Sequence, residues 1–241
     1  MNDTIKINKY GFKMIAHRGV SKLELENSKE AFIAAGNRTY YGVETDIRLT
    51  KDNKLVTFHD DDLKRMAGLD KLVSNLTLEE LQDLILHTDY NCIKCKNRFI
   101  EYKDYLQIMK HYNKVPVIEL KHGLNDETIE KVYYLTMDCF NNDINKFIFI
   151  SFNFEYLLKL RKLNKNLNIQ YLFGKDFDEN LKKCIDNNFD LDIHYNLLTK
   201  ENALKIEKAG LKLNVWTVDD INWIESHKDY KIDYITSNIL E

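Results

Sequence analysis

No stretch of this sequence is long and apolar enough to be a membrane span. Such a helix needs about 18 or more consecutive apolar residues, and every apolar run in the chain is far shorter. Residues 1–30 alternate between polar and apolar side chains and lack the continuous apolar core of a signal peptide. We therefore expect a cytoplasmic protein with no stable membrane insertion.

Cysteine is also scarce, with 4 residues in a chain of 241. This number is too small for a disulfide framework in a chain of this length, which agrees with a reducing compartment. Cys92 and Cys95 form a C-x-x-C pair, a spacing that also occurs in zinc sites and redox pairs. No second pair and no suitably spaced cysteine or histidine follows, so we predict incidental thiols in a loop.

An excess of charge of either sign is missing as well. The chain has 35 Lys and Arg residues against 38 Asp and Glu residues, for a net charge of −3. This balance gives no global basic field of the kind that attracts nucleic acid or an anionic membrane surface. Any phosphate binding must therefore be local. The length fits a single large domain, and we expect residues 1–241 to form it.

Strand and helix patterns alternate along most of the chain. The predicted strands lie at 13–17, 41–49, 115–120, 147–151, 168–173, 191–195, 212–218 and 234–236. This succession of βα units favours an α/β fold of the closed (β/α)8 TIM-barrel type over an open doubly wound sheet. A further strand pattern at 54–59 is interpreted as an extension of the second unit.

Residues 61–113 break this rhythm, and we interpret them as an insertion after the second strand. The segment has a mixed apolar content and no clear strand pattern. Thr77-Leu78-Glu79-Glu80 has the capping-box pattern, which predicts a helix near 78–87. A second helix at about 101–112 would lead back to the barrel.

Acidic side chains lie near the ends of two predicted strands. Glu44 and Asp46 are two residues apart, so they leave the same face with Cα atoms about 7 Å apart. Glu119 ends the apolar run 115–118, at the strand end that forms the catalytic face of barrels. Three carboxylates without cysteine suit one hard divalent cation, Mg²⁺ or Ca²⁺. The alternative, that Glu44 and Asp46 lie on a solvent-exposed face of the strand, is disfavoured because both faces of barrel strands are covered.

His17 and His59 each end a predicted strand, and these strands should be close in a barrel. With an unperturbed pKa of about 6.5, one imidazole can accept a proton from a nucleophile while the other donates one to a leaving alcohol. Arg18 supplies a planar fork for two phosphate oxygens. Lys121 stands two residues after Glu119, where its ammonium group can contact phosphate or form a salt bridge with a neighbouring acid.

These residues together resemble the glycerophosphodiester phosphodiesterase family. The motif runs in order through His17-Arg18-Gly19, Glu26-Asn27, Glu44-x-Asp46, Thr50-Lys51-Asp52, His59-Asp60 and Glu119-x-Lys121. It continues in the two segments Ser151-Phe152 and Val215-Trp216-Thr217-Val218. The resemblance therefore covers nearly the whole chain, and the spacing of its charged motifs is specific.

The resemblance implies a TIM barrel with a small insertion after the second strand. It also implies a small-molecule substrate, a glycerophosphodiester that is hydrolysed to glycerol 3-phosphate and an alcohol with the help of one divalent cation. In this family pattern the metal acids and the two catalytic histidines fall on Glu44, Asp46, Glu119, His17 and His59. These positions are the ones that the residues themselves had already indicated.

Four more residues receive a role through the resemblance. Arg18 and Lys121 would hold the phosphate. Phe152 and Trp216 would line the glycerol or headgroup side, although an aromatic residue at a strand end often only closes a core. The sequence departs from the family pattern at three places, none of them in the acids or histidines. Leu25 replaces a proline, Ser28 stands where threonine is usual, and Thr236-Ser237-Asn238 replaces a closing Thr-Asp.

Two other functions would use the same site. A lysophospholipase D would accept an acylated glycerol, with the apolar residues of the insertion as a lip for the chain, yet nothing resembles a membrane-anchoring helix. A catalytically dead barrel would only bind phosphodiesters, and the complete set of histidines and acids argues against it. The sequence leaves open the headgroup, the choice between Mg²⁺ and Ca²⁺, and the oligomeric state. It also leaves open whether water or a glycerol hydroxyl is the nucleophile, and which histidine is acid or base.

Overall fold

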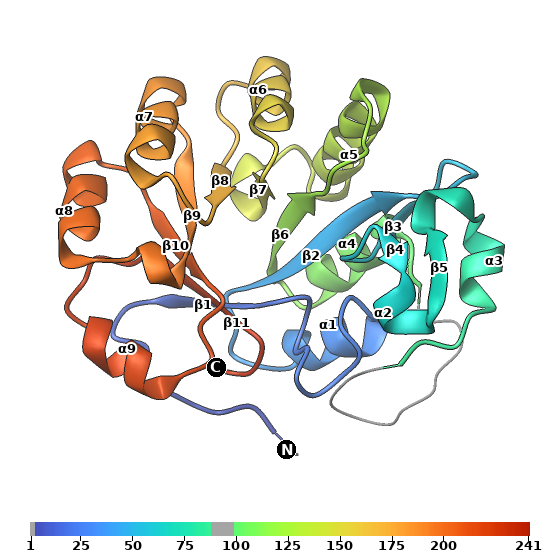
Figure 1. Ribbon diagram of the computed structural model, residues 1–241, viewed down its shortest axis with the longest axis horizontal. Coiled ribbons are helices and arrows are strands. Elements are labelled where there is room, and N and C mark those ends of the chain that lie inside the picture. The colour runs from blue at the N-terminus through green and yellow to red at the C-terminus, as the bar shows by residue number, and fades with distance from the viewer. Residues whose placement is uncertain (1–2, 88–98) are drawn as a thin grey trace.

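The computed structural model describes residues 3–87 and 99–241 as a barrel of parallel strands surrounded by helices (Figure 1). The barrel strands are β1 (Lys13–Ala16), β2 (Gly42–Leu49), β6 (Val115–Leu120), β7 (Ile148–Ser151), β8 (Ile169–Phe173), β9 (Asp190–His194), β10 (Leu213–Trp216) and β11 (Tyr234–Ser237). They are the strands that the sequence predicts, with small shifts at their ends.

The ring closes because β1 pairs in parallel with both β2 and β11. The remaining barrel strands pair in parallel in the order β11-β10-β9-β8-β7-β6-β2. The (β/α)8 barrel expected from the sequence is therefore confirmed. The strand predicted at 54–59 is β3 (Leu55–Thr57), which pairs antiparallel to the end of β2 and extends it. Since parallel strands end on the same side of a barrel, the residues that follow β1, β2 and β6 come together there.

Helices cover the outside of the barrel (Figure 1). Their bounds are α1 (Lys29–Gly36), α4 (Tyr102–His111), α5 (Asp126–Cys139), α6 (Phe154–Leu163), α7 (Phe177–Asn187), α8 (Lys200–Ala209) and α9 (Ile221–His227), with the 3₁₀ turns η2 (Ile144–Lys146) and η3 (Tyr195–Leu197) between them. Several begin at a capping residue. Ser28, Asn125 and Thr199 each accept a hydrogen bond from a backbone N–H in the first turn of α1, α5 and α8.

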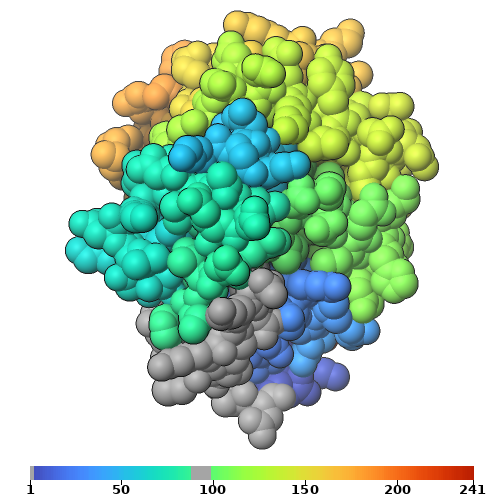
Figure 2. All heavy atoms as spheres, turned by 90° about the vertical axis from the view of Figure 1, so that its right-hand side faces the viewer, coloured from blue at the N-terminus to red at the C-terminus, as the bar shows by residue number. Residues whose placement is uncertain are grey.

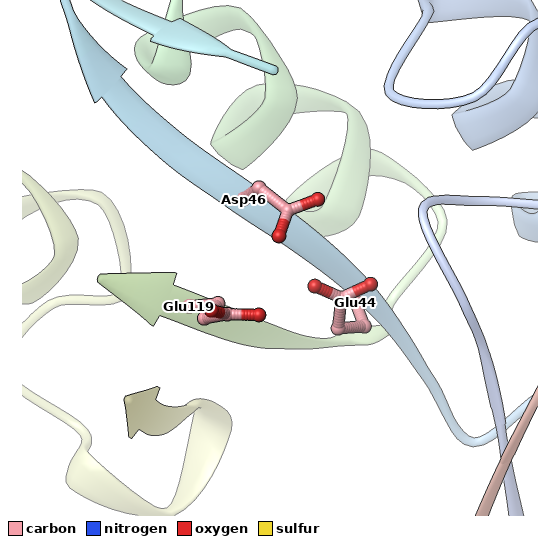
Figure 3. A group of neighbouring side chains, drawn as sticks. All are labelled: Glu44, Asp46 and Glu119. Atoms are coloured by element: carbon pink, nitrogen blue, oxygen red, sulfur yellow. The ribbon is translucent and has the colours of Figure 1, made fainter. Parts of the chain in front are cut away.

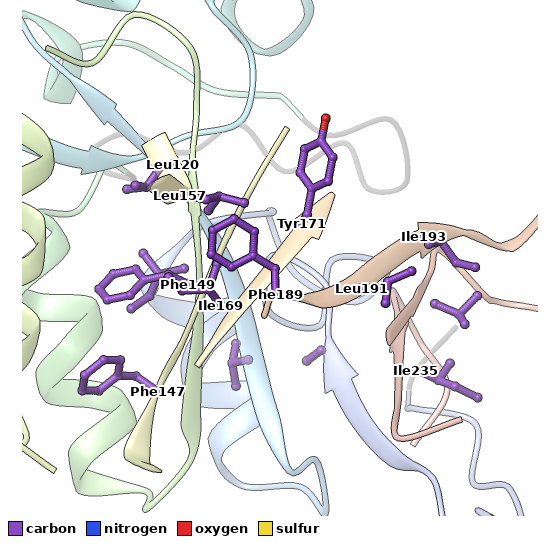
Figure 4. Packing of buried hydrophobic residues seen from close by; sticks show 14 of the residues in the cluster. Leu120, Phe147, Phe149, Leu157, Ile169, Tyr171, Phe189, Leu191, Ile193 and Ile235 are labelled. Carbon is purple, nitrogen blue, oxygen red and sulfur yellow. The ribbon is translucent and has the colours of Figure 1, made fainter. Parts of the chain in front are cut away.

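Apolar side chains fill the layer between the helices and the strands. Phe147, Phe149 and Ile169 of the β7–β8 region are buried there together with Leu157 of α6, and Figure 4 shows them side by side. This layer is the main hydrophobic core, and it holds the strands in the register that the site requires.

The faces of β2 are divided between this core and the barrel interior. Val43 and Ile47 belong to the main core. Because side chains alternate along a strand, Glu44 and Asp46 point to the opposite face, into the barrel. All three residues from Glu44 to Asp46 are buried. Burial of the two carboxylates costs free energy unless a cation or hydrogen-bond donors compensate it.

The segment after β3 folds as short elements against one side of the barrel, where it appears in cyan to teal in Figure 2. These elements are β4 (Asp62–Leu63), α2 (Lys64–Ala67), β5 (Leu69–Leu72), η1 (Val73–Asn75) and α3 (Leu78–Gln82). The prediction that this segment has no clear strand is wrong, because β4 and β5 pair antiparallel. The pair gives no pattern to detect, since β4 has 2 residues and all of β5 is exposed.

Other parts of residues 61–113 agree better with the prediction. The capping box of Thr77 and Glu80 is present at the start of α3. A separate small core lies under these elements and includes Leu63 and Leu81. The helix predicted at about 101–112 is α4. It lies in the outer layer of the barrel, where it contacts α1, α5 and β6.

Cys92 and Cys95 lie outside the described residues. Within the described part of the chain, Cys139 and Cys184 are buried free thiols. In the same ranges, 3–87 and 99–241, no helix has both the length and the apolar composition needed to cross a bilayer.

Candidate active site

Three carboxylates converge inside the barrel near the ends of β2 and β6. Glu44 and Asp46 project from β2 and Glu119 from β6, and Figure 3 shows the three side chains close together. The strand register places Asp46 directly opposite Glu119. One oxygen from each carboxylate lies within 4.8 Å of the other two. This spacing lets all three reach a single cation.

The electrostatics of the trio also fit a cation. Glu44 Oε1 and Asp46 Oδ1 are buried, and neither has a hydrogen-bond partner within the described part of the chain. Burial and the negative charge of Asp46 raise the pKa of Glu44 well above its usual value and that of Glu119 to about 7. A bound cation would favour the ionised form of these buried carboxyls and would meet the oxygens that lack a partner. Because all the donor atoms are oxygens, the site suits Mg²⁺ or Ca²⁺.

Asp46 is held in its ionised form by positive neighbours. Burial alone would raise the pKa of Asp46, but the charges of Lys121 and Arg18 keep it below the usual range. Lys121 Nζ lies 3.5 Å from Asp46 Oδ1 and 2.8 Å from Glu119 Oε1. Arg18 Nε lies 3.5 Å from Asp46 Oδ2. The salt bridge of Lys121 that the sequence offered as one alternative is therefore present, and its contact with phosphate stays a prediction.

Asn27 fixes the orientation of Asp46. Its side-chain amide donates a hydrogen bond to Asp46 Oδ2 at 2.8 Å, while its Oδ1 accepts one from the hydroxyl of Thr45 at 2.8 Å. Asn27 has a left-handed backbone with φ of 55°, a conformation that asparagine tolerates better than most residues. The sequence motif contains Glu26-Asn27, but only the fold shows what the amide does.

The turn after β1 brings the backbone itself into the site. The N–H of Arg18 donates to Glu44 Oε2 at 2.8 Å. Gly19 follows with φ of +77°, and a Cβ atom at this position would lie 2.6 Å from the backbone carbon of Ala31. Only glycine fits there, so the Arg-Gly part of the motif serves to bring this turn against helix α1.

His17 is oriented by the last segment of the chain. Its Nδ1 lies 2.7 Å from Asn238 Oδ1, and Asn238 in turn donates from Nδ2 to Asp219 Oδ2 at 2.7 Å. Because the amide nitrogen of Asn238 faces Asp219, its oxygen faces His17 and accepts a hydrogen bond from Nδ1–H. The lone pair of His17 is then on Nε2, which lies 3.9 Å from Glu44 Oε2. Burial and the charge of Arg18 lower the pKa of His17 to about 4.

His59 is oriented by a chain of alternating charges. Its Nδ1 lies 2.6 Å from Asp60 Oδ1. Arg65 of α2 donates to Asp60 at 2.7 Å and to Glu26 at 2.7 Å, and Glu26 accepts from Arg18 at 2.9 Å. Burial opposes ionisation of Asp60, but the hydrogen bond with His59 and the charge of Arg65 hold the pKa of its carboxyl below the usual range. The two histidines are thus linked through Arg18.

A cavity of about 300 Å³ connects these groups. Both histidines, Arg18, Glu44 and Glu119 line one side of it, and the other side includes Ile150, Phe152, Leu172, Asp192 and Trp216. The rings of Phe152 and Trp216 meet edge to face, with centroids 5.5 Å apart. A larger hollow of about 760 Å³ lies beside Lys114 and Val115 at the opposite end of the barrel, and no histidine is among its lining residues.

The fold therefore brings all nine predicted site residues to one end of the barrel, with Asp46 and Lys121 in contact with the residues that line the cavity. Sequence reasoning missed the partners that orient them. Asp60 follows His59 directly and could have been suspected. Asp219 and Asn238 carry no local signal, because their partners Asn238 and His17 are 19 and 221 residues away. Arg65 joins Asp60, 5 residues before it, to Glu26, 39 residues before it.

The barrel and its site define the class: a TIM-barrel protein with a carboxylate cation site beside two histidines and an arginine. The family model for the "Glycerophosphoryl diester phosphodiesterase family" matches residues 17–240. The chain therefore belongs to this family, whose members are phosphoric diester hydrolases.

Individual relatives agree with this membership. A glycerophosphodiester phosphodiesterase of Caldanaerobacter subterraneus is 28% identical over 208 residues, which covers 86% of this chain and 85% of the relative. The crystal structure of a glycerophosphodiester phosphodiesterase from Parabacteroides distasonis is 28% identical, covers 95% of this chain and 93% of its own, and gives a TM-score of 0.75. An Oleispira antarctica phosphodiesterase is alike in fold, with 23% identity, coverage of 97% and 96%, and a TM-score of 0.80.

Proposed function

We propose that this protein hydrolyses glycerophosphodiesters to glycerol 3-phosphate and an alcohol with the help of one divalent cation. The observation that carries the proposal is that three buried acids, two oriented histidines and an arginine converge on one cavity. The Oleispira antarctica phosphodiesterase of the same fold was solved in complex with the product sn-glycerol-3-phosphate, which is the product proposed for this chain.

The cation would be held by Glu44, Asp46 and Glu119, whose oxygens lie within 4.8 Å of one another. When bound, it supplies positive charge to non-bridging phosphate oxygens and lowers the pKa of a nearby nucleophile. Asn27 keeps Asp46 in position for this role through its hydrogen bond of 2.8 Å. Both Mg²⁺ and Ca²⁺ suit this set of oxygen ligands.

We assign the base to His17 and the acid to His59. Asn238 holds the proton of His17 on Nδ1, so Nε2 is free to take a proton from water or from the neighbouring glycerol hydroxyl. Asp60 faces Nδ1 of His59 at 2.6 Å, and its negative charge stabilises the imidazolium that would donate a proton to the leaving alcohol.

The phosphate would be held mainly by Arg18, which lines the cavity. Its buried Nε has an ion-pair contact of 3.5 Å with Asp46 and no hydrogen-bond partner among the described residues. Lys121 would add positive charge from behind the acids, to which it is bound. Phe152 and Trp216 would enclose the organic part of the substrate, because they line the wall of the cavity away from the acids.

The direct test is the turnover of glycerophosphocholine by His17→Ala and His59→Ala. Each change should lower kcat by about 100-fold or more, the usual contribution of a positioned acid or base, while the thermal unfolding profile stays cooperative. His227→Ala, on α9, is a matched control and should keep full activity. Full activity in both site variants would contradict the acid and base assignment.

Removal of the cation is the second test. Excess EDTA should abolish turnover of glycerophosphocholine, and titration with Mg²⁺ or Ca²⁺ should restore it, which also identifies the preferred ion. Glu119→Gln should require a higher concentration of the ion, because one charged ligand is lost. Undiminished activity after exhaustive chelation would refute the metal role.

We also propose that residues 1–241 act as one domain in the cytoplasm. Buried free thiols at Cys139 and Cys184 support the reducing compartment. For the domain, the support is that the segment after β3 packs its small core against Val56 and Phe58 at the end of the β2–β3 unit.

A further inference from the structure

One acidic side chain in the cavity has no role in the proposed reaction. Asp192 belongs to β9, whose residues Leu191 and Ile193 pack into the main core. The alternation of the strand turns Asp192 the other way, into the barrel, where it lines the cavity. It is 1% exposed. A carboxyl group here is costly, since burial of a polar group without a partner destabilises the fold.

Asn214 lowers the pKa of Asp192 through a side-chain hydrogen bond, but burial outweighs this contact, so the protein offsets only part of the cost. Asp192 Oδ1 is buried and has no hydrogen-bond partner among the described residues. The neighbouring polar side chains of the barrel interior are engaged with one another. Thr236 donates to Asn214 Oδ1 at 3.1 Å, and Asn214 donates to Gln170 Oε1 at 3.1 Å. An oxygen left without a donor at the wall of a substrate cavity is available to a donor on the substrate.

The position of Asp192 in the barrel determines which part of the substrate it can contact. In the strand order, β9 lies four steps from β2 in either direction, so Asp192 faces Glu44 and Asp46 across the barrel. With phosphate at Arg18 and the acids, the atoms farthest from phosphorus reach toward β9. Ile150, Leu172 and Trp216 give that wall an otherwise mainly apolar character. Asp192 is the carboxyl group on this side of the cavity lining.

The chemistry of Asp192 fits a hydroxyl group. Burial and the negative charge of Glu119 raise the pKa of Asp192 well above its usual value. A protonated carboxyl both donates and accepts a hydrogen bond, as an alcohol does. A quaternary ammonium headgroup has no N–H or O–H to satisfy Oδ1. An acylated hydroxyl has lost its hydrogen and carries a chain as well.

On the basis of the proposed function, we propose that Asp192 binds the terminal hydroxyl of the glycerol moiety, the one farther from the phosphoester, and so selects free glycerol diesters over acylated ones. Asp192 is then a specificity-determining residue. It explains within one side chain why this site would act as a glycerophosphodiesterase rather than as a lysophospholipase D.

The test compares two choline diesters that differ in one hydroxyl. Glycerophosphocholine carries the terminal hydroxyl, and the corresponding 1,2-propanediol diester lacks it but keeps the hydroxyl next to the phosphoester. Wild-type protein should prefer glycerophosphocholine by about 10- to 100-fold in kcat/KM, the effect of an unsatisfied buried partner. Asp192→Ala should lose this preference, mainly through a higher KM for glycerophosphocholine. Its kcat/KM ratio for lysophosphatidylcholine over glycerophosphocholine should rise by a similar factor.

Thermal unfolding without substrate separates this role from a structural one. Asp192→Asn should leave Tm unchanged or raise it by a few degrees, because an ionisable group with an unsatisfied oxygen is replaced by a neutral amide of equal size. Gln170→Ala, which changes a buried polar residue of the neighbouring strand β8, is the control. It should lower Tm, because it leaves Asn214 without its acceptor, and it should keep the wild-type preference between the two diesters.

Several results would overturn the assignment. One is an Asp192→Ala protein with the wild-type preference, and another is an equal loss on both diesters together with a lower Tm in Asp192→Asn. A change in preference among headgroups, with no change between the two choline diesters, would place Asp192 on the leaving-group side. If wild-type protein turns over neither diester, the proposed function fails and the role of Asp192 fails with it.

Discussion

At His17 the decisive contact comes from the far end of the chain. Asn238, which stands where the family pattern leads one to expect a different ending, accepts a hydrogen bond from His17 Nδ1. Asp219 anchors the amide of Asn238 from the other side, and Lys22 pairs with Asp219 at 2.9 Å. A departure that looked like a loss in the sequence therefore has a defined place in the site, as the group that sets the tautomer of a histidine.

We predict that Asn238→Ala lowers kcat for glycerophosphocholine by about 10- to 100-fold, the usual effect of removing a partner that orients a site residue. KM should change little, because Asn238 does not line the cavity. The ¹⁵N chemical shifts of the His17 ring should show a mixture of tautomers in place of one. Ser21→Ala is the control, since it removes the other donor to Asn238 Oδ1 and leaves the His17 contact in place. An unchanged kcat would show that His17 needs no such partner.

Among the secondary-structure elements, β2 determines the most. It supplies two of the three acids, pairs with β1 and β6 on its two sides, and carries β3 at its end. Its alternation is readable in the sequence because Val43 and Ile47 are apolar and Glu44 and Asp46 are not. The short β4–β5 pair has no such contrast, which is why its strands were missed while β2 was found.

Helix α2 reaches the site through Arg65. Arg65 lies in α2 and bonds to both Asp60 and Glu26, so the packing of α2 controls the partner of His59. Leu63, directly before α2, is fully buried in the small core of that segment.

We predict that Leu63→Ala lowers the free energy of unfolding by about 2–5 kcal/mol, the usual range for a buried leucine. Leu72→Ala in the same segment should change it by no more than about 0.5 kcal/mol, because Leu72 is 46% exposed. Urea denaturation followed by circular dichroism measures both values. Equal losses in the two variants would mean that the segment does not pack as a unit with its own core.

For the whole molecule, the buried acids of the site couple stability to pH and to the cation. Burial and the charge of Asp46 raise the pKa of Glu119 from 4.5 to about 7, and burial raises that of Glu44. At these two acids the folded protein binds more protons than the unfolded chain between these pH values, whereas His17, whose pKa is lowered to about 4, binds fewer below its usual value of about 6.5. The contribution of the acids to the free energy of unfolding therefore falls as the pH rises through this window, and above about pH 6.5 His17 no longer opposes it. A bound cation replaces those protons and removes the penalty.

We predict that the chelated protein has a lower Tm at about pH 8 than at about pH 6.5, and that adding Mg²⁺ or Ca²⁺ raises Tm more at the higher pH. Differential scanning calorimetry at both pH values, with and without the ion, measures the effect. Glu119→Gln should flatten the pH dependence of the chelated protein. A Tm that rises with pH in the absence of the ion would contradict the charge repulsion inferred for the acids.

The sequence by itself determined the barrel and the residues of the candidate site. Periodicity identifies strands whose apolar residues face a continuous core, and the polar residues His17, Glu44, His59 and Glu119 stand out because they interrupt or end apolar runs. These patterns are local, so they can be recognised in the sequence without the structure.

Only the tertiary structure decided how those residues are held. Asn238 reaches His17 because β11 closes the ring against β1, and Asp192 faces the acids because β9 lies opposite β2. These pairs join positions that are 221 residues apart for Asn238 and His17 and 148 residues apart for Asp192 and Glu44, and they leave no pattern in either neighbourhood. The physical reason is that strand pairing and barrel closure, not sequence proximity, decide which polar groups share a cavity and which of them remain without a partner.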